Sequence, residues 1–166
     1  LARMREALED FESVSGRSHP EDYRFIPFHT PFPNIVRKAA VLGYRHTIRD
    51  TEIEDELAGA IGRQPRPEEY DDHDEFSEDI QEYMDNLAET EVYREWYERT
   101  IEPTLDISSR VGNWYTGSVH LARLSALIYA KREGIDLAGQ TLLVGSYGSG
   151  AQAEIHEETV VDGWEN

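Results

Sequence analysis

Two segments of the sequence place reactive side chains beside expected secondary structure. His29, within Phe-His-Thr-Pro-Phe, stands at the carboxyl end of an expected strand, the edge at which open α/β sheets bind ligands. An imidazole there can act as a general acid or base near neutral pH, although a lone histidine is more often structural. Asn113, within Gly-Asn-Trp-Tyr-Thr, precedes an expected helix, so its amide either caps that helix or presents a donor to a substrate carbonyl.

The third candidate is glycine-rich and spans residues 145–150, Gly-Ser-Tyr-Gly-Ser-Gly. Glycines let backbone N–H groups approach a ligand oxygen, and Ser149 adds a hydroxyl at the same place; a tight turn without a ligand is the alternative. A nucleotide-binding motif needs a helix directly after its glycines. Residues 151–156 instead alternate apolar and polar side chains, as a strand does. The sequence therefore argues against a dinucleotide site.

The elements that must position these residues alternate between helix and strand. Residues 1–15 carry apolar side chains at helical spacing and predict a helix. Residues 23–28 predict a short buried strand, in which Pro27 fits poorly because it has no N–H to donate. Residues 33–43 predict a second helix that ends at Gly43.

The last third of the chain adds a helix and a hairpin. Small residues such as Ala122 and Ala126 predict a helix from about 118 to 132 that is buried on several sides. Residues 141–144 predict a strand, which the glycine-rich segment joins to the alternating strand that follows. Helices and strands in this order indicate an α/β fold.

Residues 50–99 differ from the rest because they hold 19 acidic and 4 basic residues. A loop at 62–67 divides this acidic segment, and an apolar stripe over 76–97 predicts a long amphipathic helix. We expect a solvated helical insertion that packs on the rest of the chain. A DNA-mimicking or metal-binding surface is the alternative. His73 lies in the acidic run, and the other histidines show no metal-ligand spacing, so we expect no metal site.

The composition of the 166 residues excludes several functional classes. Cysteine is absent, so this chain supplies no disulfide and no cysteine nucleophile. A formal charge of −18 disfavours nucleic acid as a partner, and no apolar run reaches the ~18–20 residues of a membrane span. Only Lys38 and Lys131 are lysines among 16 basic residues, which favours a protein adapted to strong salt, where charges are screened over ~3 Å. An ordinary acidic cytoplasmic protein is the alternative.

Four segments together, in their order and gaps, resemble hydroxymethylglutaryl-CoA synthase. The resemblance covers nearly the whole chain and is weakest over residues 50–100. It implies an α/β fold, the incomplete C-terminal half of a thiolase-type fold, with an acidic helical insertion. The implied parts are 1–49, 50–102 (the insertion) and 103–166. The four segments are residues 28–32 followed by Lys38, 112–119, 137–139 and 146–150.

The resemblance implies an acyltransferase that condenses acetyl-CoA with acetoacetyl-CoA on the mevalonate route to isoprenoids. The substrates would be CoA thioesters, with no further cofactor. His29 matches the family's active-site histidine, which would polarise a thioester carbonyl or shuttle a proton. Asn113 matches the asparagine that holds the acyl chain, and Ser149 matches the serine of the glycine loop.

Lys38 matches one of two family lysines that hold the CoA moiety. The second lysine falls at Asn34 in this sequence, which weakens the phosphate contact that the resemblance implies. Arg37 is a possible replacement, although neighbouring helix positions Arg37 and Lys38 point about 100° apart.

The family's cysteine nucleophile and glutamate acid–base belong to its N-terminal half. We therefore expect a C-terminal fragment that is inactive without that half, as a start inside an amphipathic helix also indicates. When complete, the enzyme would be a cytoplasmic homodimer. Two alternatives remain. One is another thiolase-fold ketoacyl synthase, which the residues around His29 disfavour; the other is a non-catalytic acidic module that binds a basic partner through residues 50–99.

Overall fold

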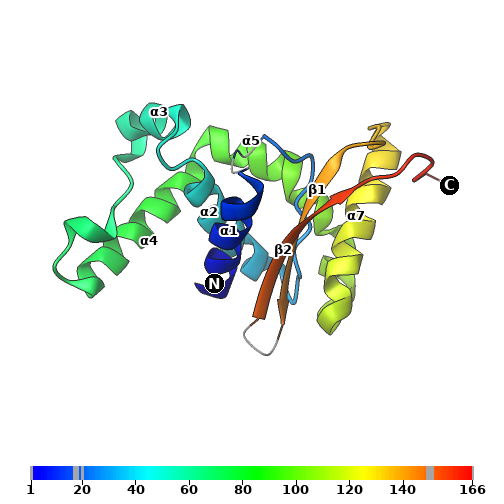
Figure 1. Ribbon diagram of the computed structural model, residues 1–166, viewed down its shortest axis with the longest axis horizontal. Helices are drawn as coiled ribbons and strands as arrows, with labels where there is room; N and C mark the ends of the chain where they lie inside the picture. The colour runs from blue at the N-terminus through cyan, green and yellow to red at the C-terminus, as the bar shows by residue number, and fades with distance from the viewer. Residues whose placement is uncertain (1, 17–18, 20, 149–151, 166) are drawn as a thin grey trace.

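The computed structural model describes residues 2–16, 19, 21–148 and 152–165. Figure 1 shows the two strands as a hairpin, with α1 and α7 beside it and α3 and α4 at the far end of the molecule. In chain order the elements are α1 (Ala2–Ser15), α2 (Pro33–Thr47), α3 (Glu52–Ile61), η1 (Pro67–Glu69), α4 (His73–Glu89), α5 (Glu91–Thr100), η2 (Glu102–Thr104), α6 (Asp106–Val111), η3 (Tyr115–Gly117), α7 (Ser118–Glu133), β1 (Thr141–Gly148) and β2 (Gln152–Thr159).

The hairpin lies between two layers of helices. Leu142 and Val144 of β1 pack in one cluster with α7, whereas Leu143 belongs to the cluster formed with α2 and α5. Phe25 lies on the α7 side, where its ring meets the edge of Tyr129 at 6.1 Å between centroids. Successive residues of β1 thus pack into clusters on opposite faces of the hairpin, because side chains alternate between the two faces of a strand. The α/β expectation is confirmed.

The hairpin pairs β1 with β2 in antiparallel register from Thr141↔Thr159 to Gly148↔Gln152. The predicted hairpin is therefore confirmed. The expectation that the connecting segment starts at Gly145 is wrong, because residues 145–148 still pair with β2, and Gly145 lies opposite Ile155. Residues 149–151 lie outside the described part of the chain.

The predicted strand over 23–28 runs parallel to β1 without becoming a regular strand. Leu143 donates its N–H to the Phe25 carbonyl at 3.3 Å, and Gly145 donates to the Pro27 carbonyl at 2.9 Å. A parallel ladder would next direct an N–H of residue 27 to Leu143, and proline has none. The regular pairing between this segment and β1 is therefore limited to a single bridge between Phe28 and Gly145.

Helix α2 continues past Gly43 to Thr47, so the predicted end at Gly43 is wrong. The next residue, Tyr44, is 2% exposed. Its ring packs at 5.3 Å from Tyr93 and 4.7 Å from Trp96, between centroids. Burial of this ring offsets the roughly 1 kcal/mol by which glycine is a worse helix former than alanine.

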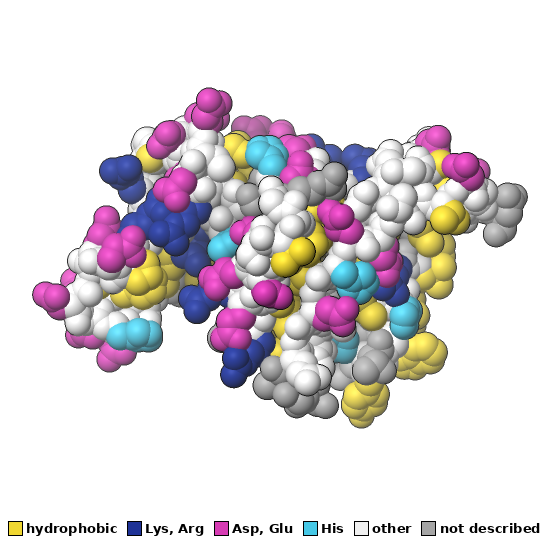
Figure 2. All heavy atoms as spheres, viewed as in Figure 1, with side chains coloured by type: hydrophobic (Ala, Val, Ile, Leu, Met, Phe, Trp, Pro, Cys, Tyr) yellow, Lys and Arg dark blue, Asp and Glu magenta, His cyan; other side chains and the backbone are white. Residues whose placement is uncertain are grey.

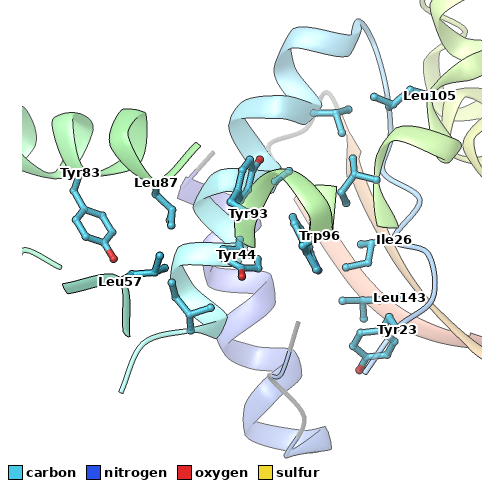
Figure 3. Close-up of a cluster of buried hydrophobic side chains, with 14 residues drawn as sticks. Tyr23, Ile26, Tyr44, Leu57, Tyr83, Leu87, Tyr93, Trp96, Leu105 and Leu143 are labelled. Atoms are coloured by element: carbon cyan, nitrogen blue, oxygen red, sulfur yellow. The ribbon is translucent and has the colours of Figure 1, made fainter. Parts of the chain in front are cut away.

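The acidic segment is helical and packs on α2 through aromatic side chains (Figure 3). The predicted long helix is two helices, α4 and α5, because Thr90 lies between them in an extended conformation. Its Oγ1 accepts a hydrogen bond from the Tyr93 N–H, which begins α5. The amphipathic helices that the stripe predicted are confirmed, with Tyr83 and Leu87 buried on the inner side, whereas the assignment of the segment as an insertion stays a prediction.

Helix α7 is covered on one side only. Ala122, Ala126 and Ala130 are fully buried, whereas Leu124 and Ile128 are 46% and 43% exposed. The expectation of burial on several sides is wrong for the chain as described, since Leu124 and Ile128 on the outer side of α7 have no covering layer there. Figure 2 shows hydrophobic side chains at the lower right of the molecule, over α7.

Candidate functional site

His29 is held directly beside β1. Its backbone N–H donates to the Gly145 carbonyl at 2.8 Å, immediately after the Phe28–Gly145 bridge. Thr30, which is fully buried, donates its hydroxyl to the Phe28 carbonyl at 2.8 Å. The backbone on both sides of His29 is therefore fixed, and the imidazole is placed at one defined position along β1.

The His29 ring is half-buried, and its Nδ1 is buried without a hydrogen-bond partner among the described residues. Burial lowers the pKa of His29 below its ordinary value, because the charged imidazolium loses solvation. At neutral pH the ring is therefore uncharged, with one nitrogen that donates and one that accepts. Such a ring can hydrogen-bond a carbonyl or relay a proton.

A cavity of about 120 Å³ opens beside this ring. His29 is the one ionisable imidazole in an otherwise largely apolar wall, which comes from α1, α2, β1 and the segment around the histidine. A small apolar group with a single polar atom, such as an acyl group, suits this lining. Besides His29, the wall includes Met4, Ile35, Ala39, Gly145 and Tyr147.

Ser149 lies outside the described residues, so the structure gives no position for its hydroxyl. Its described neighbour, Gly148, ends β1 three residues after Gly145. Figure 1 shows the extended segment before α2, the end of β1 and the start of α7 at the same end of the molecule. The described parts of the three predicted segments thus share one end of the fold.

Asn113 is exposed and lies just before η3 and α7. Its Oδ1 accepts a hydrogen bond from the Tyr115 N–H at 2.9 Å. The side chain thus closes a local turn and does not cap α7, whose preceding residue is Gly117. Asn113 does not line the cavity beside His29, so the structure does not bring these two side chains together.

The turn at Asn113 is strained and displays two aromatic rings. Tyr115 has a φ of 51°, a left-handed conformation that non-glycine residues rarely adopt. Its side chain is 79% exposed, and that of Trp114 is 61% exposed. The Trp114 ring covers Gly117 so closely that a Cβ there would lie 2.7 Å from Trp114 Cε3.

Lys38 is exposed on α2 and borders a groove of about 500 Å³ between α2, α4 and α5. The groove is separate from the His29 cavity, whose α2 wall is formed by other residues of that helix. Arg37 lines the same groove. Burial raises the pKa of Tyr97, and the positive charge of Arg37 beside it partly offsets this rise. Asn34 is exposed in the first turn of α2. The cations at 37 and 38 therefore face a common groove.

Tyr147 and Met4 line the His29 cavity, although neither is a predicted site residue. Tyr147 was treated as part of a turn, although the alternation of β1 and β2 could have placed it on a strand face. Met4 was assigned to an amphipathic helix, and its apolar stripe gave the only signal. Nothing in the local sequence links α1 to His29, since the contact is tertiary.

Within the described ranges, no group of three or more His, Asp or Glu side chains is arranged to hold a metal ion. The metal-binding alternative for the acidic segment thus gains no support. None of the described helices is both long and apolar enough to cross a membrane.

Solved structures with the same arrangement are hydroxymethylglutaryl synthases. MvaS in complex with 3-hydroxy-3-methylglutaryl coenzyme A aligns with a TM-score of 0.59 and 25% identity, over 98% of this chain and 36% of that chain. The synthase of the curacin biosynthetic pathway, in complex with a holo donor acyl carrier protein, aligns with a TM-score of 0.58 and 19% identity, over 96% and 29%. The fold is part of a thiolase-type fold.

The family model described as hydroxymethylglutaryl-coenzyme A synthase C terminal matches residues 3–166, and the chain belongs to this family. The hydroxymethylglutaryl-CoA synthase of Haloferax volcanii is 68% identical over 164 residues, or 99% of this chain. The chain spans 37% of the length of that relative. Family membership favours the synthase reading over the ketoacyl synthase and the non-catalytic module.

Proposed function

We propose that this chain supplies the C-terminal part of a hydroxymethylglutaryl-CoA synthase, an acyltransferase that condenses acetyl-CoA with acetoacetyl-CoA in the mevalonate pathway. The observation that carries the proposal is the position of His29. A neutral imidazole with an unpartnered buried Nδ1 faces an apolar cavity of acyl size, in a chain of this family. No cofactor beyond the CoA thioester substrates is required.

In this proposal His29 acts on the thioester carbonyl of acetoacetyl-CoA. A ring N–H donates a hydrogen bond to the carbonyl oxygen and polarises it, and the second ring nitrogen accepts or returns a proton. The lowered pKa suits this role, because a neutral ring is present over the whole neutral pH range. The fixed backbone of His29 holds the ring in position before substrate arrives.

The other predicted site residues take binding roles. Asn113 lies outside the His29 cavity and uses its Oδ1 within its own turn, so its Nδ2 would donate to a part of the acyl thioester that extends beyond this cavity. For Ser149, which lies outside the described residues, the proposed role is a hydrogen bond from its hydroxyl to an acyl oxygen. Lys38, with Arg37 beside it, would hold phosphate groups of CoA at the groove.

The chain has no cysteine, so the acyl-accepting nucleophile must come from elsewhere. We assign it, together with the general acid–base, to an N-terminal part of the enzyme, consistent with the 37% of the relative that this chain spans. The surface that this part would cover carries exposed apolar side chains. They are Val111, Trp114, Tyr115, Leu124 and Ile128.

Two further proposals concern the setting of the protein. The acidic excess and the scarcity of lysine suit a cytoplasm rich in salt, where close charges are screened. The complete enzyme would work there as a homodimer.

The test is reconstitution. We expect no condensation by the 166 residues alone, and activity when the N-terminal part of the synthase is added or the full reading frame is restored. His29→Ala in the active protein should lower kcat by about 10²–10⁴-fold. His73→Ala, an exposed histidine of α4, is the matched control and should have no effect. Normal turnover with His29→Ala would refute the catalytic role of His29. Condensation by the chain alone would refute the assignment of the nucleophile to an N-terminal part of the enzyme.

A further inference from the structure

A second, smaller cavity lies behind the His29 cavity. Its volume is about 60 Å³, and it is lined mainly by apolar side chains of α1, α2, α5, β1 and β2 and of the segment before α2. Leu8, Trp96 and Leu143 are buried members of this wall. Four residues line both cavities: Met4, Phe28, Ala39 and Gly145. The two spaces are therefore neighbours divided by a shared wall.

The ring of Phe28 is the main part of that wall. It lies against the backbone of Gly145, where a Cβ would come within 2.5 Å of Phe28 Cδ1. The same Cβ would lie 3.1 Å from Met4 Cε, so Met4 packs against the ring at this point. The pairing of Phe28 with Gly145 fixes the backbone that carries the ring. Phe28 also directly precedes His29, so the wall and the imidazole are positioned by one segment.

The small cavity favours carbon chains, because most of its wall is apolar. It has room for about two water-sized groups, and the Glu12 carboxylate, whose Oε1 is buried without a hydrogen-bond partner among the described residues, is a charged group in its wall. An aliphatic chain that entered from the His29 side would bury further methylene groups there, at about a fourfold gain in affinity for each.

We propose that Phe28, supported by Met4, limits the length of the acyl chain that binds beside His29. This inference rests on the proposed function, since it takes an acyl thioester as the ligand of the His29 cavity. With Phe28 in place, the cavity ends at the ring and accepts an acetyl- or acetoacetyl-sized group. Without the ring, the two cavities join and a longer chain fits.

The test compares chain-length profiles of the 166-residue chain and its Phe28→Ala variant. The probes are S-acyl-N-acetylcysteamine thioesters with acetyl, butyryl and hexanoyl chains, and binding is followed by NMR at His29 and the Met4 methyl group. We expect Phe28→Ala to bind hexanoyl about 15-fold more tightly relative to acetyl than the parent does, from two added methylenes. Phe76→Ala removes the same ring from α4, away from both cavities, and should leave the profile unchanged. An unchanged profile in Phe28→Ala would overturn the proposal.

A second probe series separates this inference from the proposed function. Straight-chain alcohols from ethanol to hexanol test the joined cavity without any thioester. If the alcohols shift toward longer chains in Phe28→Ala but no thioester binds either protein, the proposed function fails and Phe28 has no role in acyl selection. If neither series shifts, the dividing wall itself is refuted. Should Phe28→Ala not fold, Phe28→Leu and Met4→Ala make smaller openings, with the same order of effects.

Discussion

The same substitution at two glycines should change stability in opposite directions. Gly43 and Gly145 both have φ outside the left-handed region, so alanine strains neither backbone. A Cβ on Gly43 meets no atom within 4 Å, and this residue lies inside α2. Gly43→Ala should therefore stabilise the chain by about 0.5–1 kcal/mol, the difference in helix preference between the two residues.

A Cβ on Gly145 would stand 2.5 Å from Phe28 Cδ1 and 2.6 Å from Cε1, closer than such atoms can approach. The ring cannot yield easily, since its backbone is paired with β1. Gly145→Ala should therefore destabilise the chain by about 1–3 kcal/mol, the usual cost of overpacking.

Thermal and urea unfolding measure both changes. At this chain length, the melting temperature should rise by about 1.5–3 °C for Gly43→Ala and fall by about 3–9 °C for Gly145→Ala. A double-mutant cycle identifies the cause, because Phe28→Ala removes the atoms that the new methyl group would meet. Gly145→Ala should then cost little. If it were neutral in the parent chain, or equally costly with Phe28→Ala, the close contact would not be the reason for glycine at this position.

Three other predictions follow from the charged groups. The unfolded chain protonates His29 near pH 6.5, whereas the folded chain does so only at a lower pH, because burial lowers the pKa of this ring. Stability should therefore fall as pH falls from 6.5 toward the folded pKa. His29→Gln should reduce this fall in pH-dependent urea unfolding, whereas an identical slope would contradict the prediction. Arg66 lies 3.0 Å from the buried carboxylate of Glu54, so Arg66→Ala should lower the free energy of unfolding by about 3 kcal/mol. Arg110→Ala removes an exposed ion pair and should lower it by at most about 0.5 kcal/mol. Equal losses in chemical unfolding would refute a stabilising role for the buried Arg66–Glu54 pair. The acidic segment repels itself in dilute buffer, so the melting temperature measured by calorimetry should rise markedly from low to molar salt, and a flat or falling curve would refute salt adaptation.

Local patterns were sufficient for the elements whose signals lie within a few residues. The apolar spacing of residues 1–15 predicted α1, and the alternation after the glycines predicted β2. The extended segment before His29 was predicted in part: residues 23–29 run alongside β1 and place the histidine beside Gly145, although they form a single bridge and no regular strand. Periodicity succeeds in these places because each segment buries its own apolar side.

Other features depend on contacts between distant parts of the chain. Gly43 does not end α2, because Tyr44 is anchored by Tyr93 and Trp96 of another helix. Thr90 interrupts the acidic helices through a cap that a continuous apolar stripe conceals. The neighbours of His29 on α1, above all Met4, could not be inferred, since no local rule says which helix covers which strand.

Gly145 is required by the packing beside His29 and not by the turn. The sequence predicted that the glycines of residues 145–150 bring backbone N–H groups close to a ligand, with a tight turn as the alternative, yet Gly145 pairs within β1 and its φ is not positive. What requires glycine is the Phe28 ring that lies on it, while its carbonyl accepts the N–H of His29. A side chain at this position would displace the ring and, through the next residue, the imidazole. The contact that stabilises this part of the fold is therefore also the contact that aims His29 at its cavity, and a change that disturbs one should disturb the other.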